Sequence, residues 1–184
     1  PYKDFKSLVE AAKAKPNTLT EANSIGGASH VATLLLAQKA GFQPRVVQVG
    51  DGPKRLQSVL GGHSAYTVVS PQEYKGFQGS GIKAIAVIGP QRDPDYPDTP
   101  STKELGFDVD VAVETWWFAP KGTPKDVVVK LADSIEKAMA DPGLKDAFVK
   151  QGVSDVLRRG DALAQHVGTI DASVQPLGRA LGGQ

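Results

Sequence analysis

The chain contains no cysteine, and its charges are nearly balanced. The absence of cysteine excludes disulfide bonds, thiol catalysis and zinc–thiolate sites, although it leaves the cellular compartment open. The 21 basic and 20 acidic residues give a formal net charge of +1, and neither sign forms a long run. The chain therefore lacks the basic stripe that nucleic-acid binding needs, and we expect no nucleic-acid partner.

Long apolar runs are also missing, and we expect the given sequence to contain no signal peptide. The longest apolar stretch, 31–37, includes Thr33 and is far too short to cross a bilayer. Without a signal peptide, we expect a secreted protein to be present here in its mature form. Thirteen prolines and twenty glycines predict many short elements, while a hydrophobic content of 40% argues against disorder.

Catalytic motifs are incomplete. The three histidines, His30, His63 and His166, show no metal-ligand spacing and no H-E-x-x-H pattern, and the chain contains no G-x-S-x-G nucleophile elbow. A hydrolase using Ser29 and His30 is an alternative, but adjacent residues point to different faces of a helix, which makes a poor dyad. We expect binding rather than catalysis.

Cofactor motifs are weak as well. The Gly-Asp-Gly run at 50–52 matches half of a dinucleotide fingerprint, but Arg55 stands in place of the third glycine, and no Walker lysine is in register. Asp93, Asp95 and Asp98 are interleaved with prolines and lack the glycine of a calcium-binding loop. We expect neither a metal ion nor a cofactor.

Short strands and helices alternate over the first half of the chain. This alternation is typical of an open, largely parallel α/β sheet. The pattern predicts helices at 4–15, 31–40 and 54–60, a helix capped by Ser70 with Pro71 at its first position, and strands at 19–22, 45–49, 65–69 and 82–88.

The second half of the sequence does not continue this alternation of strands and helices. A proline-rich loop leads to a short helix and a long strand, and three more helices follow. The longest of them has an apolar stripe of Val128, Leu131, Ile135 and Met139. The longest predicted helix is capped by the Thr123-Pro124 end of the preceding turn. The predicted elements are a loop at 89–100, a helix at 101–105, a strand at 109–118 and helices at 124–140, 143–151 and 161–177, of which 124–140 is the longest. The shift in composition at 115–124 marks a crossing between lobes, where we expect Trp116 and Trp117 to pack rather than to stack on a ligand.

The segment 19–30 is the most informative part of the chain. A strand breaks into small residues, and an apolar helix follows at once. Gly26 and Gly27 allow close approach of the backbone, Ser29 is a suitable N-cap, and the free N–H groups of a helix N-terminus attract anions. These residues predict a site for a carboxylate or phosphate. They are equally compatible with an ordinary capped helix after a turn.

Four stretches together resemble the solute-binding proteins of tripartite tricarboxylate transporters, the Bug-type or TctC-type receptors. They follow the family's order and spacing across nearly the whole chain. The stretches are Gly26-Gly27-Ala28-Ser29-His30-Val31, Leu60-Gly61-Gly62-His63, the segment from Arg92 to Gly106, and Thr115-Trp116-Trp117 followed by Pro120-Lys121-Gly122-Thr123-Pro124.

This resemblance implies a periplasmic receptor of the type II binding-protein fold, with a short, mainly parallel sheet flanked by helices. Such a receptor closes on a small organic carboxylate and delivers it to the membrane permease subunits without chemistry. Residues 1–117 would form the second lobe, and the helices of 118–184 would return to the first lobe. The implied ligand-binding residues are Ile25, Gly26, Gly27, Ala28, Ser29, Val49, Gly50 and Ser70.

Three departures from the family pattern affect the expected function. Ala65 replaces a common aspartate, which disfavours a ligand with an amino group, and Val49 replaces an aromatic residue. The family's opening lobe is absent from the sequence, so we expect weak binding and an exposed apolar stripe at 128–139 that favours a homodimer. The alternative is a sensor or adaptor module that binds a partner protein through this stripe.

Overall fold

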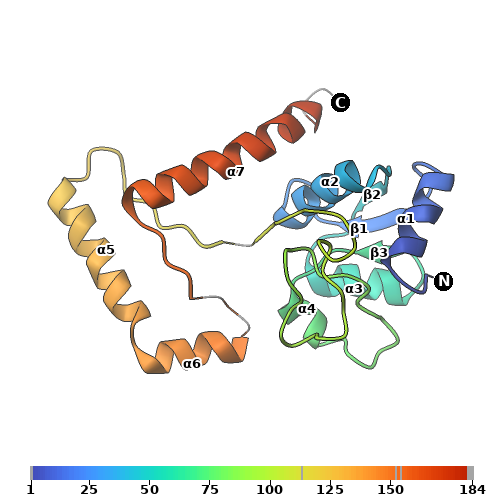
Figure 1. The fold of residues 1–184 in the computed structure, drawn as a ribbon, viewed down its shortest axis with the longest axis horizontal. Coiled ribbons are helices and arrows are strands. Elements are labelled where there is room, and N and C mark those ends of the chain that lie inside the picture. The colour runs from blue at the N-terminus through green and yellow to red at the C-terminus, as the bar shows by residue number, and fades with distance from the viewer. Residues whose placement is uncertain (1, 113, 152, 154, 182–184) are drawn as a thin grey trace. The chain divides into compact units, whose positions relative to one another are not determined.

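A computed structural model describes residues 2–112, 114–151, 153 and 155–181 (Figure 1). The chain divides into two compact units, Pro1–Val113 (unit 1) and Glu114–Gln184 (unit 2). The sequence placed a boundary a few residues later, after residue 117. The assignment of the two parts to different lobes of a receptor stays a prediction.

Unit 1 alternates helices and strands as the sequence predicts. Each of the first five predicted elements is found within three residues of its expected bounds. The elements are α1 (Phe5–Ala14), β1 (Thr20–Asn23), α2 (Ala28–Ala40), β2 (Arg45–Gln48), α3 (Gly52–Leu60), β3 (Tyr66–Thr67) and α4 (Pro71–Lys75).

The sheet of unit 1 is parallel and has the strand order β2-β1-β3. In β1, Glu21 pairs with Val46 on one side and with Tyr66 on the other. The chain moves from β1 to β2 in one direction and returns across β1 to reach β3. This reversal beside β1 is a topological switch point, and ligands of open α/β sheets bind at the carboxyl ends of the strands there.

Local side chains explain where the helices begin and end. The Asp4 side chain accepts the Ser7 N–H at 2.8 Å, which caps α1. Gly41 ends α2 in the left-handed conformation, with φ of 71°. Ser70 caps α4 with Pro71 at its first position, which confirms the expected start of this helix.

The apolar core of unit 1 lies between α1 and α2. One face of α1 supplies Phe5, Val9 and Ala12, and Phe5 meets Phe107 edge-on at a centroid distance of 5.6 Å. The other buried members of this cluster are Leu36, Ala37, Ala40, Phe42 and Val109. This packing fixes the carboxyl half of α2 against α1.

The predicted strand at 82–88 is wrong. Only Val87 forms a bridge, to Ser101. The Tyr74 hydroxyl donates to Ile82 O at 3.3 Å and accepts from Ala84 N at 3.2 Å. Side-chain and loop contacts therefore replace the ladder that an apolar run would need to form a strand.

Two further predictions in this region are also wrong. Residues 101–105 form turns rather than a helix, with Glu104 accepting the Ser101 N–H at 3.0 Å. The alternating segment 109–118 is in no strand within its described residues, because no neighbouring strand pairs with it there. Strand 65–69 is reduced to the two residues of β3.

The regular secondary structure in the described part of unit 2 is entirely helical. The helices are α5 (Lys125–Met139), α6 (Pro142–Gln151) and α7 (Gly160–Leu181). The longest helix is α7, with 22 residues and Pro176 inside it, and not the 124–140 helix that the sequence predicts. The Thr123 hydroxyl donates to Pro120 O, so it does not cap α5. No residue of α5 is buried, and Val128 and Leu131 of its stripe are 41% and 54% exposed.

Candidate anion-binding site

The loop between β1 and α2 lies at the switch point of the sheet. It begins at Asn23, the last residue of β1, and ends at Gly27, the N-cap of α2. Gly26 has φ of 85°, a conformation that L side chains rarely adopt. The loop therefore turns sharply and directs the N-terminus of α2 toward the carboxyl edge of the sheet.

Three of the five loop N–H groups that the sequence singles out already have acceptors within the protein. These bonds fix the loop backbone rather than leave it open to a guest. Ile25 N donates to Gln48 Oε1 at 2.6 Å, Gly26 N to His30 Nδ1 at 3.2 Å, and Gly27 N to Ser24 O at 2.9 Å.

The remaining two N–H groups belong to Ala28 and Ser29, the first two residues of α2. Within the described residues, neither donates to a protein acceptor. Ala28 is exposed and Ser29 is half-buried, so both groups lie at the surface of the loop. Adjacent free N–H groups at a helix N-terminus, together with the helix dipole, form a site that favours an anion.

Ser29 does not cap α2, contrary to the sequence prediction. The N-cap is Gly27, which has no side chain to make a cap bond, and Ser29 is the second residue of the helix. The Ser29 hydroxyl donates to Asn23 Oδ1 at 2.7 Å and accepts a short hydrogen bond from Arg55 Nη1. A hydroxyl has one proton to donate, so in this arrangement Ser29 offers a ligand its N–H but not its O–H.

His30 supports the loop as a neutral side chain. It is 3% exposed, and burial lowers its pKa. Its Nδ1 accepts the Gly26 N–H, which places the ring proton on Nε2. Because the Ser29 hydroxyl donates to Asn23 instead of to His30, the structure does not form the dyad that the hydrolase alternative requires.

A buried polar cluster lies beneath the loop, in the centre of the sheet. Glu21 is fully buried, and its Oε1 accepts Asn23 Nδ2 at 2.7 Å and the Thr33 hydroxyl at 2.5 Å. Burial raises the pKa of Glu21 to about 7, although these hydrogen bonds and the charge of Arg55 act to lower it. Burial also raises the pKa of Tyr66, with the nearby Glu21 carboxylate as the next cause. The cluster is therefore sensitive to pH near neutrality.

Arg55 connects the helices α2, α3 and α4 at the carboxyl edge of the sheet. It projects from α3, its Nη1 donates to Ser29 in α2, and its Nη2 lies 3.6 Å from Glu73 Oε2 in α4. The side chain is 6% exposed. Its buried Nε has no partner within the described residues. A buried cation thus lies directly behind the start of α2.

The predicted contribution of Ser70 is limited by its capping role. Its hydroxyl accepts the Glu73 N–H at 3.2 Å, and its own N–H donates to Glu73 Oε2 at 2.9 Å. Glu73 also lies against Gly52, where a Cβ would come within 2.0 Å of Glu73 Oε1. Glu73 therefore occupies the space between the start of α3 and α4.

The predicted Val49–Gly50 turn follows β2 at the same edge. The N–H groups of Val49 and Gly50 both donate to Asn23 O, at 2.9 and 3.4 Å. Gly50 has φ of 113°, so glycine is favoured at this turn. The structure thus brings this turn beside the start of the loop, with its two N–H groups already bonded.

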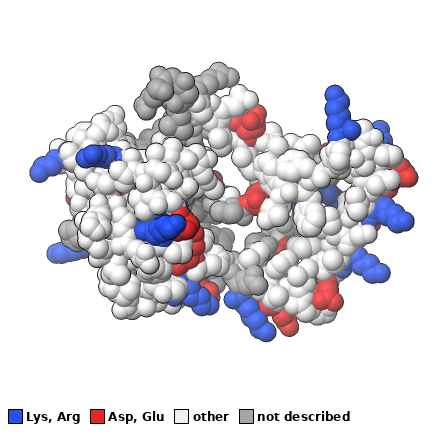
Figure 2. All heavy atoms as spheres, turned by 180° about the vertical axis from the view of Figure 1, so that it is seen from behind, with Lys and Arg blue, Asp and Glu red and all other residues white. Residues whose placement is uncertain are grey.

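Other kinds of site are not found in the described part of the chain. No group of three or more His, Asp or Glu residues there could hold a metal ion. None of the helices, again within the described residues, is long and apolar enough to cross a membrane. Figure 2 shows basic and acidic side chains scattered over the visible face rather than gathered by sign.

Residues 1–179 match the model of the tripartite tricarboxylate transporter family receptors, TctC. The chain belongs to this family. Its relatives include the protein BugT of Bordetella pertussis, which is 29% identical over 161 residues, 84% of this chain and 48% of BugT. The family is one of solute-binding receptors, as the four sequence stretches indicate, and the predicted family membership is confirmed.

Solved structures confirm the α/β binding-protein fold. A TctC solute-binding protein from Polaromonas, solved without ligand, has a TM-score of 0.72 and 24% identity, and the match covers 96% of this chain and 62% of that one. A protein of R. palustris solved with adipate has a TM-score of 0.70 and 19% identity, with coverage of 97% and 60%. The chain spans slightly less than half the length of the curated relatives that it matches.

One departure from the TctC pattern lies away from the loop. The N–H of Ala65 donates to Thr20 O at 2.8 Å, at the amino end of β1. The candidate anion site lies at the carboxyl end of the same strand. The geometry therefore lends no support to the expectation that Ala65 decides whether a ligand amino group is recognised.

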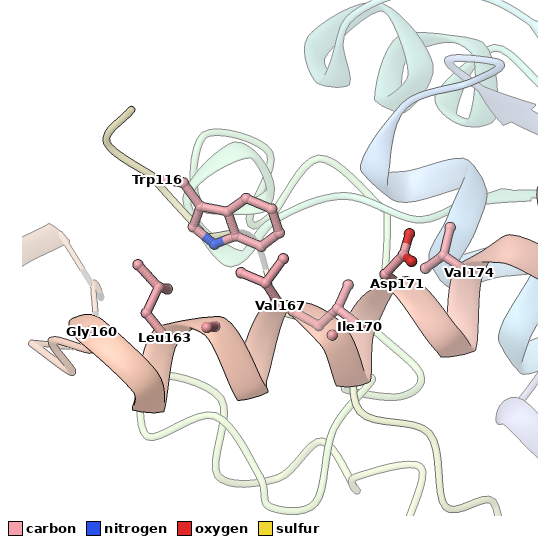
Figure 3. Close-up of a pocket in the computed structure, with 9 residues that line it drawn as sticks. Trp116, Gly160, Leu163, Val167, Ile170, Asp171 and Val174 are labelled. Carbon is pink, nitrogen blue, oxygen red and sulfur yellow. The ribbon is translucent and has the colours of Figure 1, made fainter. Parts of the chain in front are cut away.

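Unit 2 contains an apolar hollow that the sequence analysis did not predict. Figure 3 shows the Trp116 indole over α7, next to Leu163 and Val167. Trp116 Nε1 donates to Glu114 Oε2 at 2.8 Å, and the other oxygen of Glu114 lies 2.6 Å from His166 Nε2. Trp116 thus packs within unit 2 as expected, whereas Trp117 is 74% exposed.

Sequence reasoning missed the buried side chains that support the loop. It used Glu21 and Asn23 only as strand and loop residues, and it treated Arg55 only as a failed glycine position. A usable signal was present, because charged and amide residues alternate with Ala22 in a strand that the topology makes central. Such positions are normally apolar unless the polar groups have partners.

Proposed function

We propose that the chain captures a small organic carboxylate at the N-terminus of α2. The free N–H groups of Ala28 and Ser29 are the observation on which the proposal rests. Two adjacent donors match the two oxygens of a carboxylate, and the helix dipole adds a favourable potential. The small side chains before them leave room for a ligand, since a Cβ at Gly26 would meet nothing within 4 Å.

The proposed ligand is a di- or tricarboxylate or a related organic acid. Family membership supports this class, and one structural neighbour was solved with adipate. Capture would proceed without chemistry, in the periplasm, and the solute would pass to the permease subunits of a tripartite transporter. Val49, Gly50 and Ser70 would face the same cleft, on the loops that follow β2 and β3.

We propose further that residues 118–184 belong to the lobe opposite the one that holds the α2 site. The observation behind this is the apolar stripe of α5, a helix in which unit 2 itself buries no residue. An unpartnered stripe of this kind favours self-association, so the chain alone would form a homodimer through it.

Isothermal titration calorimetry of the whole chain tests the proposed capture. Adipate is the probe, and adipamide, which has the same length without charge, is the control ligand. We expect adipate to bind with a dissociation constant in the micromolar to millimolar range, because closure by a second lobe would supply much of the affinity. Adipamide should bind more weakly. Equal binding of the two ligands, or no binding of adipate, would exclude an anion site, and sub-micromolar binding would contradict a half-site.

A further inference from the structure

Arg55 stands out as a buried charge that the proposed function does not use. An arginine side chain with 6% exposure is unusual unless its donors are paired. Here Nη1 is directed at the Ser29 hydroxyl, Nη2 faces Glu73, and Nε has no partner within the described residues. Two of the three guanidinium nitrogens therefore have protein partners. One of these partners, Ser29, belongs to the candidate anion site.

We propose that Arg55 is a positioning residue that raises the affinity of this site for anionic ligands, an inference that rests on the proposed function. It holds Ser29 by its side chain, and the N–H of the same residue is one of the two free donors at the start of α2. The rotamer and backbone of Ser29 are thereby fixed before a ligand arrives. The guanidinium also adds a positive charge within a buried region, where screening is weak.

Glu73 reduces this charge without cancelling it. Its Oε2 lies 3.6 Å from Arg55 Nη2, whereas the bond to Ser29 is made by Nη1. Glu73 is also held by the Ser70 N–H, and a third of its side chain is exposed to solvent. Removal of the Glu73 charge should therefore strengthen the attraction of an anion, and removal of the Arg55 charge should weaken it.

The same unit offers a matched control pair. Arg92 Nε lies 2.9 Å from Glu104 Oε2, and both side chains are 46% exposed. Arg92 also donates to Pro97 O, and Glu104 accepts from Ser101 N, so this pair supports the surface loop at 89–106. Substitutions at Arg92 and Glu104 change the net charge of the chain by the same amounts as those at Arg55 and Glu73.

The experiment measures adipate dissociation constants by NMR titration of the full chain at neutral pH. We expect R55Q to weaken adipate binding about tenfold, and R92Q to change it by less than about twofold, because an exposed charge is screened. R55K, which retains the charge, should stay within about threefold of the unsubstituted chain. E73Q should tighten binding by about threefold, and E104Q should leave it unchanged.

The outcomes separate the two proposals. If the unsubstituted chain binds no adipate, the proposed function fails, and the role of Arg55 fails with it. If adipate binds but R55Q and R92Q behave alike, only the role of Arg55 is overturned. Should R55Q not fold, E73Q decides: tighter binding than in E104Q supports the inference, and equal or weaker binding overturns it.

Discussion

The buried carboxyl group of Glu21 makes unit 1 less stable as the pH rises. Its pKa is about 7 in the folded chain, compared with an ordinary value of 4.5. The folded chain therefore keeps a proton that the unfolded chain has already lost, and the contribution of Glu21 is fully present below pH 4.5 and lost as the pH rises through about 7. At about 1.4 kcal/mol per pKa unit, this interval corresponds to roughly 3 kcal/mol.

The substitution Glu21→Gln isolates this effect. Glutamine has the same shape and no titratable proton, so the free energy of unfolding of E21Q relative to the unsubstituted chain should rise by roughly 3 kcal/mol between pH 4.5 and a pH above 7. His30, whose pKa is lowered by burial, acts in the opposite direction as the pH falls, but it is present in both chains and cancels in the difference.

Urea unfolding at a series of pH values, followed by the amide resonances of unit 1, measures this difference. Glu10→Gln is the matched control, since Glu10 is an exposed acid on α1 of the same unit. A pH dependence for E21Q no larger than that for E10Q would show that the buried carboxyl group is already ionised below neutrality, and the reasoning would be refuted.

Two further predictions concern Gly52 and the apolar stripe of α5. An alanine at Gly52 would place a Cβ 2.0 Å from Glu73 Oε1, whereas at Gly76 the nearest atom is 3.9 Å away. In urea unfolding, G52A should therefore lose about 1–3 kcal/mol more stability than G76A, and equal losses would show that Glu73 is not fixed there. Lysine at both Val128 and Leu131 should reduce the concentration-dependent mass in light scattering, because both side chains are exposed. A chain that is already a monodisperse monomer would contradict the proposed interface.

Local signals made much of unit 1 predictable. Ser70 followed by Pro71 is a helix start signal with one dominant structural use, and the structure confirms it at the start of α4. The range of α1 was also predictable, because its apolar residues recur every three or four positions. Family membership could be predicted because the four stretches follow the order and spacing of the family pattern.

Non-local contacts decided what the sequence could not show. The apolar run at 82–88 predicts a strand. In the structure the Tyr74 hydroxyl of α4 forms hydrogen bonds with the backbone of Ile82 and Ala84 instead. The local sequence predicts Ser29 as an N-cap, but its hydroxyl forms hydrogen bonds with Asn23 and Arg55, which lie 6 and 26 positions away in the sequence. A single sequence does not reveal which polar side chains meet, and the hydroxyl of the predicted cap is instead bonded to Asn23 and Arg55.

The central claim is that the first two N–H groups of α2 bind a carboxylate. Titration of the ¹⁵N-labelled chain with adipate, followed by amide chemical shifts, tests it most directly. The amides of Ala28 and Ser29 should shift most and reach saturation together, while that of Ile25, already bonded to Gln48, should move little. Saturable shifts confined to another part of the chain, such as the Trp116 hollow, would contradict the account.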